Sequence, residues 1–592
     1  MLDNIKSINI LKRVINFVPK RKYLEIFINN KNLQKKLNIS IDTYIKLFNQ
    51  IEIEIIPKGI PYYSKEKFPF IKMFNENKNS FYVYFDDNPK RIKRNYFIQK
   101  DKISKIKVII ENENQQFDKL FKNCKYIKEI NFIKFNRKNI KDMSKMFYGC
   151  TSLEKLDISK MHTDRVESMD HFFYECKSLK ELNLSNFKTN KVKNSNSMFE
   201  KCSSLEVLDV SNFTIDECTD MGCMFNECSS LKEINLSKVN TIKVQNMNSL
   251  FKGCSKLAKL DINFHTENVT NMNSMFYDCK LLTEINTKNF VTSKVTDMSS
   301  MFYGCSLLSE LNVSSFNTSQ TTNMINMFNN CSSLKELDLS NFDTSKVTNM
   351  SFMFHLCNSL SKLNIKNFKT NNVTDMSGMF HNCDSLEELD LSHFNMDKVT
   401  DIRYFFCGCG KLNNLILFEI NHSNINNMSC LFENCSSLTR LSFSNINTSN
   451  VNNMSYMFKG CKSLTDIDLT NFDTSNVMDM KFMFSECSSL KELNIMNFNF
   501  ESLNDMSYMF NKCSSLTDLE IPKINNDIDI DYLFSDCNEK LKSNMAKHNL
   551  NKNAFNDESK KKYIKPDYED TMPGGIEIGN ADENEIENEN NV

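Results

Sequence analysis

The chain has 592 residues and a formal net charge of −1, with 73 Lys and Arg against 74 Asp and Glu. This balance excludes a strong global field that would attract nucleic acid or an anionic membrane surface. No stretch approaches the ~20 apolar residues that a membrane helix needs, and Lys12 and Arg13 split the apolar N-terminal run, so we expect neither a transmembrane segment nor a secretory signal. The expected location is therefore intracellular (cytoplasmic), with the cell surface as the alternative.

Residues 1–50 are predicted to form a small helical module. Apolar residues fall at helical spacing between Ile10 and Val18, and Pro19 ends this first helix. The order of Ile10-Leu11, Phe17-Val18-Pro19, Leu24, Leu33 and Leu37 resembles an F-box, the helical adaptor that recruits a ubiquitin-ligase scaffold. The opening Leu-Pro of that family is Ile8-Asn9 in this chain, and any amphipathic helical cap would produce the same pattern, so both interpretations stay open.

Residues 51–104 are predicted to be a linker of short strands that serves as an N-terminal cap. Residues 51–55 alternate between Ile and Glu, and residues 81–85 consist only of Phe, Tyr and Val. Both patterns are typical of strands. A solenoid needs such a cap because its end rung exposes apolar surface. We expect a first degenerate rung to follow, with residues 106–110 as its strand and Cys124 at its end.

A repeat of 26 residues dominates residues 105–537. One cysteine marks each copy, and fourteen of the sixteen intervals between these cysteines are 26 residues, one is 25 and one is 24. A fixed period of this size indicates a solenoid, whose rungs bury their apolar faces only by stacking on neighbours. The repeated cysteines are Cys124, Cys150, Cys176, Cys202, Cys228, Cys254, Cys279, Cys305, Cys331, Cys357, Cys383, Cys409, Cys435, Cys461, Cys487, Cys513 and Cys537.

Each rung combines two periodicities. In residues 142–150 apolar side chains fall at i, i+3, i+4 and i+7, which predicts a two-turn helix capped by Asp142. The pattern Leu-x-x-Leu-x-Ile over residues 153–158 predicts a short strand. The expected fold is an α/β solenoid, a right-handed coil of about 17 rungs with a parallel sheet on the concave face and short helices on the other. Its predicted structural core includes Met350, Met353, Phe354 and Cys357.

The full repeat resembles a known family. Leu-x-x-Leu-x-Leu, followed by Phe-x-Thr-x-x-Val-Thr-Asp/Asn-Met-Ser-x-Met-Phe-x-x-Cys, is similar to the BspA-like leucine-rich repeats over about 420 residues. The resemblance implies a leucine-rich-repeat fold and binding to other proteins. Members of that family are often called surface proteins and are implicated in adhesion, so an exported adhesin is one functional alternative.

The repeat ends after Cys537. Residues 538–565 are predicted to be a C-terminal cap and polar linker, beginning with a helix through Leu541, Met545 and Leu550. Residues 566–592 are strongly acidic and contain no basic residue, so we expect a disordered tail.

The repeat offers no constellation typical of catalysis, so we expect a protein that is not an enzyme and that uses no cofactor or metal. Cysteines at one identical rung position favour reduced core thiols over disulfides. His355 and His381 are expected to stack as a surface pair rather than to bind a metal. In the most divergent rung a zinc site formed by Cys407, Cys409, Cys430 and Cys435 is the alternative to ordinary packing.

The candidate functional feature is a row of outward side chains along the predicted sheet. Its Asp and Asn residues mostly alternate, which limits repulsion between like charges about 5 Å apart. The row is either a solubilising stripe or an acidic recognition face for a basic or extended protein partner, and the oligomeric state stays open. We favour a non-catalytic interaction scaffold, with a ubiquitin-ligase adaptor or an adhesin as alternatives. The candidate binding residues are Asp157, Asp209, Asp261, Asp338, Asp390, Asp468, Glu336 and Glu388.

Overall fold

The computed structural model describes most of the repeat region and parts of the N-terminal segment. Of residues 1–50, the helix α3 (Lys31–Leu37) buries Leu33 and Leu37. Most positions that carry the F-box resemblance, and the acidic tail, lie outside the described residues, so those interpretations stay predictions. The described residues are 7, 10, 26, 27, 29–37, 40, 49–59, 66–72, 80–111, 117–420, 424–443, 445–548 and 550–557.

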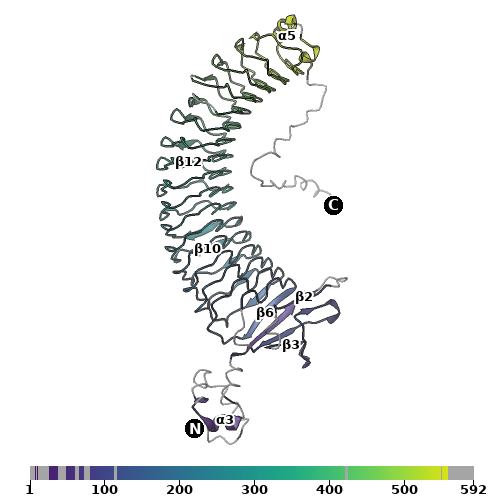
Figure 1. The fold of residues 1–592 in the computed structure, drawn as a ribbon, viewed down its shortest axis with the longest axis vertical. Helices are drawn as coiled ribbons and strands as arrows, with labels where there is room; N and C mark the ends of the chain where they lie inside the picture. The colour runs from purple at the N-terminus through teal and green to yellow at the C-terminus, as the bar shows by residue number, and fades with distance from the viewer. Residues whose placement is uncertain are drawn as a thin grey trace, which may run out of the picture.

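An antiparallel sheet precedes the coil. Strands β1 (Ile51–Pro57), β3 (Phe81–Phe85) and β5 (Ile106–Ile110) bury alternate side chains, as their polarity patterns predict. They pair in the order β3-β5-β1-β6-β7, where β6 (Ile127–Lys134) is antiparallel to β1 and parallel to β7 (Lys155–Asp157). β6 therefore joins the cap to the coil (Figure 1).

The cap sheet corrects one boundary. Residues 106–110 were expected to form the strand of a first rung, but β5 pairs antiparallel with both β1 and β3. Both of its edges are therefore occupied within the cap, and no edge remains for a parallel neighbour. The parallel stack of strands begins with β6. The cap also contains β2 (Phe68–Pro69), β4 (Tyr96–Phe97) and the 3-10 helix η3 (Gln99–Asp101).

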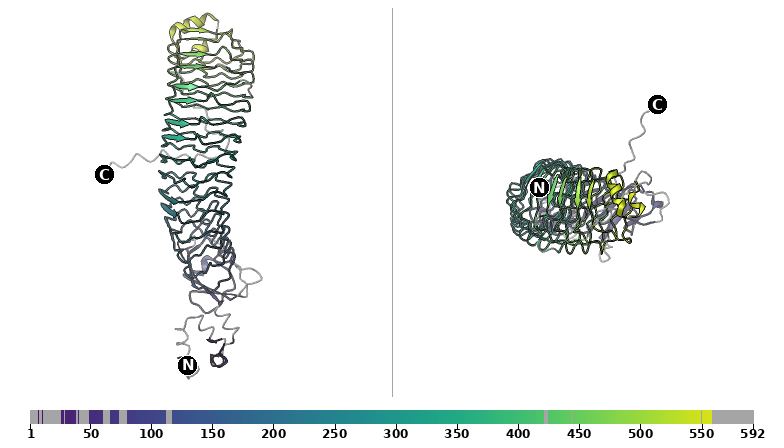
Figure 2. Two further views of the ribbon diagram at one scale, coloured as in Figure 1. Left: turned by 90° about the vertical axis from the view of Figure 1, so that its left-hand side faces the viewer. Right: turned by 90° about the horizontal axis from the view of Figure 1, so that it is seen from above.

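The prediction of a solenoid of stacked rungs is confirmed. Strands in neighbouring rungs are parallel and in register at the repeat period, as Glu336↔Lys362 and Leu337↔Leu363 show. Figure 2 shows these short strands stacked one above another along the coil. The strands after β7 are β8 (Glu181–Leu182), β9 (Val207–Leu208), β10 (Glu233–Leu236), β11 (Lys259–Ile262), β12 (Glu336–Asp338), β13 (Lys362–Asn364), β14 (Glu388–Asp390), β15 (Asn414–Ile416), β16 (Arg440–Ser442), β17 (Asp466–Asp468), β18 (Glu492–Asn494) and β19 (Asp518–Glu520).

The segment predicted as a two-turn helix in each rung is a series of tight turns instead. In residues 142–150, Lys145 and Gly149 have φ of 57° and 71°, in the left-handed region that an α-helix does not tolerate. The N–H groups of Met143 and Phe147 donate to Ser168 and Phe172 in the next rung, at 3.1 and 3.0 Å. Hydrogen bonds between rungs thus replace those of a helix, while the apolar spacing still points one set of side chains inward. We call these stacked segments the turn stack.

The core is a set of ladders that run the length of the coil. Met350, Met353, Phe354 and Cys357 have no exposed surface. The Phe354 ring stacks between Phe328 and Phe380, with centroid distances of 5.7 and 5.6 Å. Each rung contributes equivalent side chains, so every rung completes the core of its neighbours.

Aromatic rings of neighbouring rungs stack more closely on the turn stack than beside the strands. The coil is curved, and Figure 1 shows the arc that it forms. Centroid distances between rings of neighbouring rungs are 4.3 Å for Tyr277 and Tyr303 on the turn stack's outer surface, 5.7 Å for Phe328 and Phe354 in the core, and 6.3 Å for Phe316 and Phe342, which follow the strands.

The C-terminal end of the coil is closed by short helices. α5 (Glu539–Met545) buries Leu541 and Met545, at positions where the sequence predicted a capping helix. The 3-10 helix η4 (Ala546–His548) follows, and η5 (Lys552–Phe555) accepts the backbone N–H bonds of the last rung, including Phe534 N–H to Ala554 O at 2.8 Å. Among the described residues no helix is long and apolar enough to cross a membrane.

Candidate functional site on the strand face

The outward side chains of the strands form one continuous surface, which we call the strand face. All eight predicted binding residues lie on it, and all eight are exposed. The parallel register places them in rows, so that Asp338 lies beside Asn364 and Asp390 lies beside Ile416. The structure therefore brings these residues into one surface but spreads them over many rungs.

Most aspartates of the row also have a structural role that sequence reasoning missed. The Oδ1 atom of Asp338 accepts a hydrogen bond of 2.9 Å from the backbone N–H of Ser340, which fixes the turn after the strand. Asn235 and Asn312 make the same bond in their rungs. Asp and Asn alternate in the row because either one supplies this oxygen. The same bond is made by Asp157, Asp209, Asp390 and Asp468.

The turn bonds also keep these carboxylates ionised. Side-chain and backbone hydrogen bonds from the residue two positions on lower the pKa of Asp157, Asp209, Asp338, Asp390 and Asp468 below the usual value. The Asp/Asn-x-Ser pattern that recurs in many of the rungs is the sequence signal that could have predicted this role.

We expect Asp338→Ala to destabilise the protein by about 1 kcal/mol, because a turn N–H loses its acceptor. Asp338→Asn should leave the stability nearly unchanged, since the amide oxygen takes the place of the carboxylate oxygen. Urea unfolding of the two variants tests this, and equal losses of stability would show that the charge of Asp338, not the hydrogen bond, is the stabilising element.

Salt bridges between rungs neutralise part of the strand face. Lys362 pairs with Glu336, and Lys259 lies 3.9 Å from Glu233. Glu388 differs, because its register neighbour in β15 is the uncharged Asn414. Among the described residues no ion pair involves Glu388.

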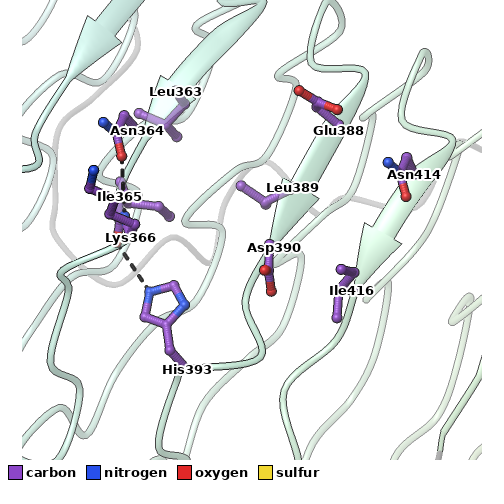
Figure 3. Close-up of a pocket in the computed structure, with 10 residues that line it drawn as sticks. All are labelled: Leu363, Asn364, Ile365, Lys366, Glu388, Leu389, Asp390, His393, Asn414 and Ile416. Carbon is purple, nitrogen blue, oxygen red and sulfur yellow. Dashed lines mark hydrogen bonds between the residues drawn. The ribbon is translucent and has the colours of Figure 1, made fainter.

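A cleft opens on the strand face beside Glu388. Strands β12 and β13 pair with each other, as do β14 and β15, but β13 and β14 belong to separate sheets. A cleft of about 400 Å³ lies there; Glu388, Asp390 and His393 line it from the rung of β14, and Lys366 lines it from the rung of β13 (Figure 3). The cleft joins two predicted binding residues to two residues that sequence reasoning did not single out.

The cleft also has apolar walls. Leu363 and Leu389 line it from the two strands, and Ile416 is 51% exposed at its rim. Ile416 occupies the position at which most other rungs carry a polar residue. The His393 ring is fixed by a contact of 3.1 Å from Nε2 to the backbone oxygen of Ile365. The cleft thus combines a fixed ring, two carboxylates and exposed apolar surface.

The cysteines of the divergent rung do not converge as a zinc site would require. The thiols of Cys409 and Cys435 donate to the backbone oxygens of Phe380 and Phe406 in the core, each at 3.1 Å. Within the described part of the chain, no three or more His, Cys, Asp or Glu side chains are placed to share a metal ion. The thiol-to-carbonyl bond recurs along the cysteine ladder, and burial raises the pKa of thiols such as Cys357 to about 12.

The predicted histidine pair does stack. The rings of His355 and His381 lie 4.6 Å apart at an interplanar angle of 17°, on the turn stack and therefore far from the strand face. Both are partly buried, and burial lowers their pKa values to about 3 and about 4; for His355 the charge of His381 lowers it further. The pair is a packing element whose neutral form is favoured.

A family model described as "Mycoplasma protein of unknown function, DUF285" matches the chain repeatedly. The matches cover residues 115–235, 219–337, 281–363, 333–443 and 426–548, which together include most of the coil. A comparison with curated proteins finds no match.

Several solved structures are similar to the chain. A leucine rich cell surface protein from Faecalibacterium prausnitzii is 16% identical, with 67% of this chain and 84% of that chain covered and a TM-score of 0.30. A leucine-rich repeat protein from Eubacterium ventriosum is 17% identical, with 57% and 80% covered and a TM-score of 0.27. The TLR13 chain of a TLR13–ssRNA13 complex is 15% identical, with 67% and 61% covered and a TM-score of 0.24, so this chain spans less than two thirds of its length.

Proposed function

Because the chain belongs to the DUF285 family of repeat proteins, whose repeats resemble the BspA-like leucine-rich repeats, we propose that it is a non-catalytic scaffold that binds another protein along its strand face. The observation that carries the proposal is the exposed row of ionised aspartates, interrupted by a cleft whose Glu388 has an uncharged register neighbour. Solenoids offer such long surfaces to extended partners, and charge complementarity would select a basic one.

The hydrogen bonds that most of these aspartates accept in the turns permit a test in which the charge is removed and the acceptor oxygen is kept. In a variant with Asn at Asp157, Asp209, Asp261, Asp338, Asp390 and Asp468, six charges are lost while an amide oxygen remains at each position. We expect this variant to lose proteins that the unmodified full-length chain captures in a salt-sensitive way, with quantification by mass spectrometry. The physical reason is that long-range attraction between opposite charges is removed without disturbing the turns.

The turn stack offers a matched control. Its own aspartates accept the same kind of backbone hydrogen bond, as Asp297 does from Ser299 at 2.9 Å. A control variant with Asn at six turn-stack aspartates should still capture the same proteins. If it loses them as much as the strand-face variant does, the strand face is refuted as the binding surface. The control carries Asn at Asp142, Asp220, Asp297, Asp375, Asp505 and Asp529.

A further inference from the structure

The cleft between β13 and β14 has a more specific chemistry than the rest of the strand face. From its lining we infer that it receives an arginine side chain of the partner protein, an inference that rests on the proposed scaffold function. Its size, about 400 Å³, lies at the lower end of the range of ligand pockets, roughly 300–1,000 Å³. A single long side chain is therefore a suitable occupant.

The carboxylates supply the first part of the match. Glu388 and Asp390 stand two residues apart on β14, so both project from the same side of the strand. The Oδ1 atom of Asp390 is occupied by the N–H of Ser392 at 2.9 Å, which leaves Oδ2 as an acceptor. Glu388 makes no ion pair among the described residues. A cation in the cleft would thus meet two carboxylates.

His393, three residues after Asp390, also lines the cleft. His393 Nε2 faces the backbone oxygen of Ile365, which can only accept, so Nε2 carries the proton. Lys366 is the one cation that lines the cleft, and its attraction contributes to the lowered pKa of Asp338 in the preceding rung. Lys366 therefore also acts on a carboxylate outside the cleft, where hydrogen bonds from Ser340 lower the pKa more.

These acceptors point to a guanidinium rather than an ammonium. The five N–H groups of arginine lie in one rigid plane and bond several acceptors at once, whereas lysine presents a compact point charge. The three methylene groups of arginine would lie against Leu389 and the exposed side chain of Ile416, which covers apolar surface that water now contacts. Contact with these methylene groups would be the role of the exposed Ile416 in an otherwise polar row.

The test uses the full-length protein and N-acetyl-arginine methylamide as the probe. Saturation-transfer difference NMR should detect binding, with a signal at least roughly fivefold above that of the uncharged citrulline analogue, because a charge-assisted pair is lost in the latter. The variant Glu388→Gln with Asp390→Asn should lose this excess. The matched control is Asp466→Asn with Asp468→Asn, at equivalent positions of β17 and outside the cleft, and it should keep the excess.

Equal signals from the arginine and citrulline probes, or an excess that survives in the Glu388/Asp390 variant, would overturn the inference. An equal signal from the lysine analogue would also overturn it, since a generic cation would then suffice. The probe needs no partner protein, so this experiment can fail while the capture experiment still supports the scaffold. The opposite result is also informative. If the unmodified protein binds the arginine probe but the variant with Asn at six strand-face aspartates captures the same proteins as the unmodified chain, the scaffold function alone is refuted.

Discussion

Phe354→Ala is expected to lower the free energy of unfolding by about 3–5 kcal/mol, the range for deleting a fully buried aromatic side chain. The Phe354 ring has no exposed surface and stacks on Phe328 and Phe380. Neighbouring rungs cannot close the cavity, because backbone hydrogen bonds such as Phe354 N–H to Met379 O at 2.9 Å fix their separation. The loss should weaken two interfaces at once, since each rung is stabilised mainly by its neighbours.

Urea unfolding followed by circular dichroism measures this loss, and hydrogen exchange locates it. We expect the amides of the rungs around residues 328–380 to exchange faster, because a weakened interface allows local opening. Lys362→Ala, at an exposed strand-face position, is the control and should change stability by less than about 0.5 kcal/mol. A Phe354→Ala variant as stable as this control would contradict the stacked core.

Acidification from pH 6.5 to pH 4.5 is expected to destabilise the protein through His355 and His381. Burial lowers the folded-state pKa values of these side chains to about 3 and about 4, and mutual repulsion contributes for His355. Above pH 6.5, the ordinary histidine value, neither state binds these protons, and the full stability is present. Below it the unfolded chain binds protons that the folded chain excludes, so stability falls by up to about 1.4 kcal/mol per pH unit for each histidine.

The chain provides its own control for the histidine pair. Tyr277 and Tyr303 occupy the same rung positions as His355 and His381, and their rings stack at 4.3 Å. The double variant His355→Tyr with His381→Tyr should therefore keep the stack and lose the extra pH dependence between pH 6.5 and 4.5. Chemical unfolding of both proteins across this range makes the comparison. Parallel stability profiles would exclude the histidine pair as the source of acid sensitivity.

The sequence by itself determined the architecture, because a period of 26 residues permits few arrangements. Cysteine at one fixed position, with Met and Phe before it, placed Phe354 and Cys357 where burial is greatest, and alternating strand residues placed Asp338 and Asp390 outward. These features depend on periodicity alone, which is a property of the chain before it folds.

Three features were decided only by the tertiary structure. Left-handed residues such as Lys145 turned an apparent helix into a stack of turns, because bonds to the next rung replace bonds within the segment. The curvature of the coil belongs to many rungs together, so no single repeat encodes it. The cleft lies where β13 and β14 do not pair, although their rungs match the repeat as well as others do. Each feature depends on contacts between neighbouring rungs, which the pattern of one rung cannot specify.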